Sequence, residues 1–119
     1  MKTFYTLTSL LFGDQMANSL EGYYKGEGPD PLEAINEIVR TMEKAVKYPG
    51  DMRYVDVGEY EYSDSNGNVI SEESVKRRGS GDFQFIICLR GYGCYIVAGT
   101  VSKKGKKWTA GAEAEAMDV

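Results

Sequence analysis

The sequence predicts an α+β protein in which an antiparallel meander sheet of about five to six strands packs on one capped helix. A helix-period apolar stripe with capping residues covers residues 31–48. After it, glycine turn signals recur at strand-length intervals between segments rich in β-branched and aromatic residues. The 119 residues fit one domain, 1–119, which is long enough to bury a core without a disulfide or a metal.

The first thirty residues leave two alternatives open. Phe4 to Thr8 alternates in the manner of a strand. Residues 9–24 fit either a second strand or an N-terminal helix, and an apolar stripe at helical spacing favours the helix. Residues 26–29, Gly-Glu-Gly-Pro, are then interpreted as a linker.

The helix over 31–48 has a clear beginning and end. Asp30 is a suitable N-cap, Pro31 occupies the first helical position, and Glu33 stands at capping-box spacing. Residues 48–50, Tyr-Pro-Gly, end the helix. The apolar stripe comprises Leu32, Ile35, Ile38, Val39, Met42, Ala45 and Val46.

The remaining turn signals predict five strands, near residues 52–62, 68–77, 83–90, 93–102 and 106–112. In the first strand, a β-bulge at Gly58-Glu59 would bring the apolar residues on both sides of it to one face. The polar second strand is expected at an edge, and the third and fourth are expected at the centre, covered at least partly on both faces. The acidic residues 113–119 are expected to form a frayed tail.

The composition excludes much catalytic chemistry. The chain has no histidine, and it lacks a nucleophile elbow and a complete phosphate-binding loop. We therefore expect no enzyme, no cofactor and no metal site. Cys88 and Cys94 flank a predicted hairpin turn and are interpreted as apolar fillers rather than a disulfide. An enzyme using Cys94 as an exposed nucleophile is the alternative that we rank last.

The N-terminal apolar run is interrupted by hydroxyl residues, and no small-x-small cleavage pattern follows it. No apolar stretch approaches the roughly 20 residues of a membrane helix. These observations predict a cytoplasmic protein without a membrane partner.

Charge is distributed unevenly along the chain. Residues 1–75 hold 14 acidic and 6 basic residues, whereas residues 76–119 hold 4 acidic and 8 basic residues. The meander places the turns at 78–82 and 103–106 at one end of the sheet and the turn at 91–93 at the other. The candidate basic surface comprises Lys76, Arg77, Arg78, Arg90, Tyr92, Lys103, Lys104, Lys106 and Lys107. The candidate acidic ribbon comprises Glu59, Glu61, Asp64, Glu72 and Glu73.

These clusters support several interpretations. In the plainest interpretation, the charged residues lie on exposed turns and edges and only keep the protein soluble. Our leading functional hypothesis is a non-catalytic binding or inhibitor protein that occupies a partner protein through its charge-polarised surface. By analogy, small motif-free proteins of this kind occur in phages and mobile elements that block host machinery.

Two further partners fit the same charges. One is a nucleotide or other phosphate held by Arg77, Arg78, Lys104 and Tyr92. The other is a second copy of the chain, with a basic end against an acidic ribbon. The net charge of −4 argues against direct DNA binding.

Overall fold

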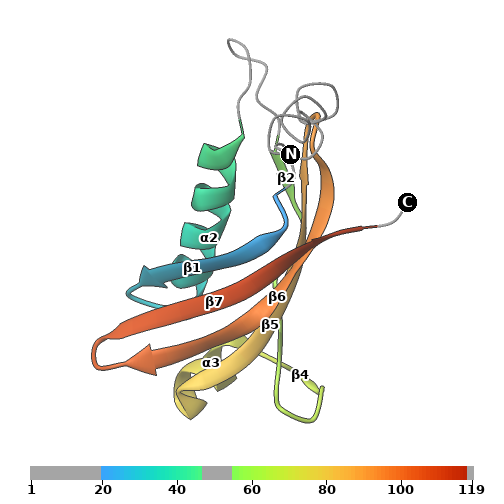
Figure 1. Ribbon diagram of the computed structural model, residues 1–119. Helices are drawn as coiled ribbons and strands as arrows, with labels where there is room; N and C mark the ends of the chain where they lie inside the picture. Colours follow the sequence, from blue (N-terminus) through green and yellow to red (C-terminus); the bar gives the residue numbers. More distant parts are fainter. Residues whose placement is uncertain (1–19, 47–54, 118–119) are drawn as a thin grey trace, which may run out of the picture.

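The computed structural model describes residues 20–46 and 55–117, and these ranges contain two helices and one antiparallel sheet of seven strands (Figure 1). The predicted α+β fold with a sheet packed on a helix is confirmed. The elements are β1 (Gly22–Gly28), α2 (Pro31–Ala45), β2 (Val55–Val57), β3 (Glu61–Ser63), β4 (Val69–Ile70), α3 (Glu72–Arg78), β5 (Ser80–Leu89), β6 (Gly93–Lys104) and β7 (Lys107–Ala116).

The sheet has the strand order β1-β7-β6-β5-β3-β4, and β2 also pairs with β5. The predicted meander is present as β5–β6–β7, which is joined by turns at 90–92 and 105–106. At one edge β1 pairs antiparallel with β7, so the early part of the chain lies beside its end. Both helices contribute buried residues to one core, and the opposite face of the sheet, called the outer face below, carries most of the polar side chains.

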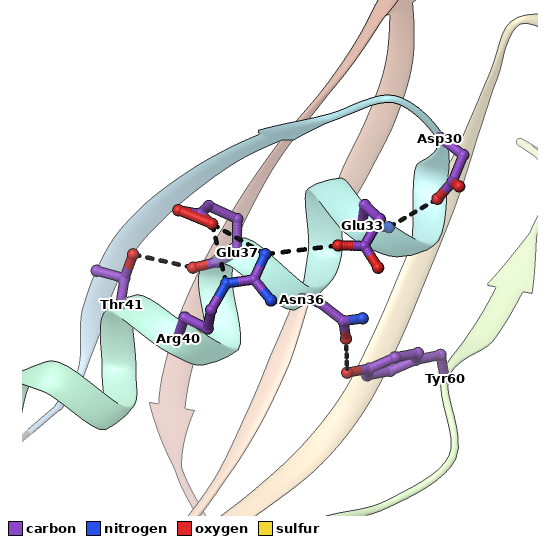
Figure 2. Close-up of polar contacts among 7 residues, drawn as sticks. All are labelled: Asp30, Glu33, Asn36, Glu37, Arg40, Thr41 and Tyr60. Atoms are coloured by element: carbon purple, nitrogen blue, oxygen red, sulfur yellow. Dashed lines mark hydrogen bonds and ion pairs between the residues drawn. The ribbon is translucent and has the colours of Figure 1, made fainter.

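Helix α2 confirms the predicted capped helix, although it ends at Ala45, and residues 47 and 48 lie outside the described ranges. The Asp30 carboxylate accepts a hydrogen bond from the backbone N–H of Glu33 at 2.8 Å, as an N-cap does. On the polar side, Arg40 lies between Glu33 and Glu37, at 3.6 and 3.0 Å from their carboxylates (Figure 2).

The β-bulge predicted at Gly58-Glu59 is confirmed by the register. Val57 pairs with Ile87 and Glu61 with Gln84, so three residues of one strand face two of the other. As a result, the four apolar side chains around the bulge all contact the core: Val55, Val57, Tyr60 and Tyr62. The Tyr60 hydroxyl donates a hydrogen bond of 2.6 Å to Asn36 Oδ1, which ties the bulge to α2 (Figure 2).

The segment before α2 differs from the prediction. The helix over 9–24 is wrong for residues 22–24, which belong to β1, and residues 9–19 lie outside the described ranges. The predicted linker 26–29 is also wrong up to Gly28, because β1 continues to that residue. A Cβ on Gly26 would collide with the carbonyl oxygen of Ala34, and one on Gly28 would lie 2.7 Å from the Glu33 Cβ. These glycines are required because α2 lies directly on β1.

The predicted edge strand over 68–77 is wrong in its second half. After the two residues of β4 the chain forms helix α3, in which the Ser71 side chain accepts a hydrogen bond from the Ser74 N–H at 3.1 Å. Gly79 closes the helix with φ of +85°. A serine N-cap, acidic residues in the first turn and basic residues in the last turn outweigh the polar character that suggested an edge strand.

The last strand is longer than predicted. β7 continues to Ala116, and residues 113–116 pair with β6, so the frayed tail expected over 113–119 is wrong for those four residues. Residues 118 and 119 lie outside the described ranges.

The central strands β5 and β6 are fully covered only on the face that packs on the helices. On the outer face, Ile86 of β5 is 40% exposed.

A disulfide joins Cys88 and Cys94, contrary to the prediction that both cysteines are apolar fillers. The two residues face each other directly in the β5–β6 ladder, because the intervening loop places Leu89 opposite Gly93. Neither cysteine is a free thiol, so Cys94 is not available as the nucleophile of the enzyme alternative.

No helix within residues 20–46 and 55–117 is long and apolar enough to cross a membrane.

Replacing Gly26 with alanine is expected to lower the free energy of unfolding by about 1–3 kcal/mol, because the added methyl group must push α2 away from β1. Gly58→Ala is the matched control, since its Cβ would meet its nearest neighbour at an ordinary 3.5 Å. Urea unfolding followed by fluorescence of the buried Trp108 measures both. Equal stability of the two variants would contradict the close helix–strand contact.

Reducing the disulfide is expected to lower the free energy of unfolding by roughly 2 kcal/mol, since the bond closes only a short loop, with a sequence separation of 6. Iodoacetamide should label neither cysteine until a reductant is added. The variant Cys88→Ser/Cys94→Ser should show the same stability with and without reductant. Labelling of untreated folded protein would show that the bond is absent.

Candidate functional site

The structure gathers seven of the predicted basic residues at one end of the sheet. Gly79, at the end of α3, accepts a hydrogen bond of 2.9 Å from the Lys103 N–H, so α3 lies beside the β6–β7 turn (Figure 1). We call the following exposed group the basic end: Lys76, Arg77, Arg78, Lys103, Lys104, Lys106 and Lys107.

Most of these charges have no acidic partner. Within the described residues, Lys107 pairs with Glu27 at 3.5 Å, and no other member of the basic end forms an ion pair. Arg78 donates a hydrogen bond from Nε to the Ser74 hydroxyl at 3.2 Å. The three cations on α3 also lie at its C-terminus, where they stabilise the helix dipole.

Arg90 and Tyr92 do not join this group. Both lie in the turn between β5 and β6, and the paired strands separate that turn from the basic end, as Figure 1 shows. Tyr92 packs against the core and its backbone carbonyl accepts a hydrogen bond from the Tyr95 hydroxyl at 2.9 Å. The predicted phosphate grip of Arg77, Arg78, Lys104 and Tyr92 is therefore not assembled.

The predicted acidic ribbon is also divided. Glu59 and Glu61 line a hollow on the outer face, whereas Glu72 and Glu73 begin α3 on the helix side of the sheet. Burial raises the pKa of the Tyr62 hydroxyl, and the nearby Glu72 carboxylate raises it further. The ribbon is wrong as a single surface because residues 72–78 are helical.

Asp64 organises a turn rather than offering a free carboxylate. Its side chain accepts hydrogen bonds from the backbone N–H groups of Asn66 and Asn68, both at 2.9 Å, and from the Asn68 side chain. The bond from the Asn68 N–H is the largest cause that lowers the pKa of Asp64, and Arg78 adds a smaller effect. Asp64 therefore stays ionised and positions the loop beside Arg78.

The outer face next to the basic end is hollowed. One hollow of about 500 Å³ lies over β5 and β6, and another of about 350 Å³ lies over β6, β7 and β1. They share Thr100 and Ser102, so we call the pair the trough. The first is lined by Asp64, Ser65, Arg78, Ser80, Gly81, Asp82, Thr100, Val101 and Ser102. The second is lined by Tyr23, Lys25, Gly26, Glu27, Thr100, Ser102, Lys104, Thr109, Ala110 and Gly111.

The register explains why these polar groups gather. Asp82 pairs with Thr100, which pairs with Gly111, which in turn pairs with Lys25. Because residues opposite one another in a ladder point to the same face, each such row crosses the outer face from β5 to β1. The neighbouring row runs Ser80, Ser102, Thr109 and Glu27.

Of the residues that line the trough, sequence reasoning named Asp64, Arg78 and Lys104 as candidates and missed the others. A signal was present, since Thr100, Ser102 and Lys104 alternate with Val101 and neighbouring residues at a period of two. Tyr23 could not be placed, because its segment was predicted to be helical.

Comparison with known proteins assigns no relative to this fold. No protein-family model matches the chain, and neither curated proteins nor solved structures give a significant match.

The Asp64 carboxyl is expected to titrate below its ordinary pKa of 3.8 in the folded protein. The lowered pKa adds stability above that ordinary value, and this stability is lost as the pH falls through the folded pKa. The gap in urea midpoint between wild type and Asp64→Asn should therefore be larger at pH 6 than near pH 2. An unchanged gap, together with an ordinary Asp64 midpoint in an NMR titration, would contradict the hydrogen-bonded turn.

Proposed function

We propose that this chain is a non-catalytic binding protein that docks on an acidic surface of a partner protein through its basic end. The observation that carries the proposal is the convergence of α3 and the β6–β7 turn, which places exposed cations without acidic partners on one surface. Such a surface steers an acidic partner into contact and disfavours basic ones.

The structure supports one surface rather than two. The predicted acidic ribbon is divided between the two sides of the sheet, so it supports no second docking surface. Self-association through that ribbon loses its basis for the same reason.

The biological setting is proposed by analogy. An inhibitor of host machinery, carried by a phage or mobile element, remains a proposal by analogy with small motif-free proteins. The cytoplasmic location also remains a prediction, and the disulfide weighs against it, because such bonds persist mainly in oxidising compartments.

The double charge reversal Arg77→Glu/Lys106→Glu tests the docking surface. Lys44→Glu/Arg90→Glu changes the net charge equally but lies on α2 and on the opposite turn. Wild-type protein should capture an acidic partner from a lysate of its source in quantitative mass spectrometry. The first variant should weaken binding to that purified partner at least about tenfold, as expected when charges at an interface are reversed.

The control variant should bind within about threefold of wild type, because its changes lie away from the interface. Equal loss in both variants would show a nonspecific charge effect and would reject the basic end as the docking surface. Circular dichroism confirms that each variant is folded.

A further inference from the structure

The trough is a polar surface whose hydroxyl groups and aromatic residue the docking proposal does not use. It crosses four strands, and its lining includes five serine and threonine hydroxyls, at Ser65, Ser80, Thr100, Ser102 and Thr109. Each hydroxyl can donate and accept a hydrogen bond. A row of such groups suits a ligand that is itself rich in hydroxyls.

Three cations and three carboxylates line the trough, so the charges of its own lining balance. Arg78, Lys25 and Lys104 line it from three elements. Of the three acidic residues, Asp64 is occupied by its own turn and Glu27 by Lys107. Asp82 is left as an acceptor for a ligand hydroxyl, and the exposed cations of the adjacent basic end, of which only Lys107 forms an ion pair within the described residues, favour an anionic ligand.

Tyr23 gives one end of the trough an aromatic surface. Its side chain is 61% exposed and lies over Gly111, where a Cβ would collide with the tyrosine hydroxyl. A glycine at this position leaves room for the ring, which then presents an apolar face beside polar groups. This combination suits the apolar face and polar rim of a sugar ring.

We propose that the trough is a binding site for an anionic oligosaccharide, with Arg78, Lys25 and Lys104 holding its sulfate or carboxylate groups and Thr100 and Ser102 its hydroxyls. The lysine-rich turn at 103–107 is of a kind that occurs in both heparin-binding and nucleic-acid-binding surfaces. Single-stranded nucleic acid is disfavoured, because its binding sites stack successive bases on several aromatic rings. Here Tyr23 is the one aromatic residue of the trough, and the chain carries a net charge of −4. The trough shares Arg78 and Lys104 with the basic end, whereas its hydroxyl groups, Lys25 and Tyr23 have no part in the proposed docking on a protein.

Adjacent residues supply a matched test. Lys104 lines the trough, whereas Lys103 pairs with the buried Trp108 and so belongs to the opposite face. Arg78 also lines the trough, and Arg77 does not. Isothermal titration of the full chain with a heparin-derived octasaccharide should detect binding. Arg78→Gln/Lys104→Gln should weaken it at least about tenfold, and Arg77→Gln/Lys103→Gln less than about threefold.

A second variant keeps all charges. Thr100→Val/Ser102→Ala removes two hydroxyls from an exposed strand face and should weaken binding by about fivefold. This variant keeps the test decisive if loss of the bond between Arg78 and Ser74 destabilises α3. A neutral malto-oligosaccharide of the same length should bind much more weakly than the heparin fragment.

Three outcomes of these experiments would contradict the proposed binding site. Equal weakening by the two charge variants would assign the binding to the basic end as a whole. Equal or tighter binding of a thymidine oligonucleotide would identify a nucleic-acid surface. Absence of heparin binding would reject the trough while leaving the partner-protein experiment unaffected, since that experiment varies Arg77 and Lys106.

Discussion

The contact between α2 and β1 determines which surface this protein can offer to a ligand. Gly26 and Gly28 have no side chains at the point where the backbone of Ala34 lies closest to the strand. The helix can therefore cover β1 and β7 closely, and its apolar stripe fills one face of the sheet. With that face occupied, the polar residues of the same strands are left on the other face.

Local rules were sufficient where they agreed with one another. The caps of α2, the bulge at Gly58 and the β5–β6–β7 meander were predicted because each has a strong short-range signal. The same local rules gave wrong predictions for β1 and α3. The glycines of β1 resemble a linker until α2 is seen to lie on them, and the serine cap of α3 was outweighed by its polar composition.

The candidate site also combines a part that could be predicted from the sequence with a part that depends on contacts between distant segments. Seven basic residues were grouped from the predicted order of the turns, although Lys76, Arg77 and Arg78 lie on α3 and not in a meander turn. The grouping holds because α3 ends where β5 begins, beside the β6–β7 turn. The trough could not be predicted, since it depends on the pairing of β1 with β7, which joins residues far apart in the sequence. The disulfide was within reach, because a loop centred on Gly91 places Cys88 opposite Cys94. It was set aside because two cysteines in a core-forming chain were interpreted as small apolar fillers.

The position of that disulfide bears on how the protein matures. The two thiols are separated by 6 positions and meet across one hairpin, so no distant part of the chain must arrive before they can react. A polypeptide made in a reducing environment can thus fold its sheet first and acquire the crosslink on reaching an oxidant. Correct pairing requires no isomerase, because two cysteines allow one connectivity.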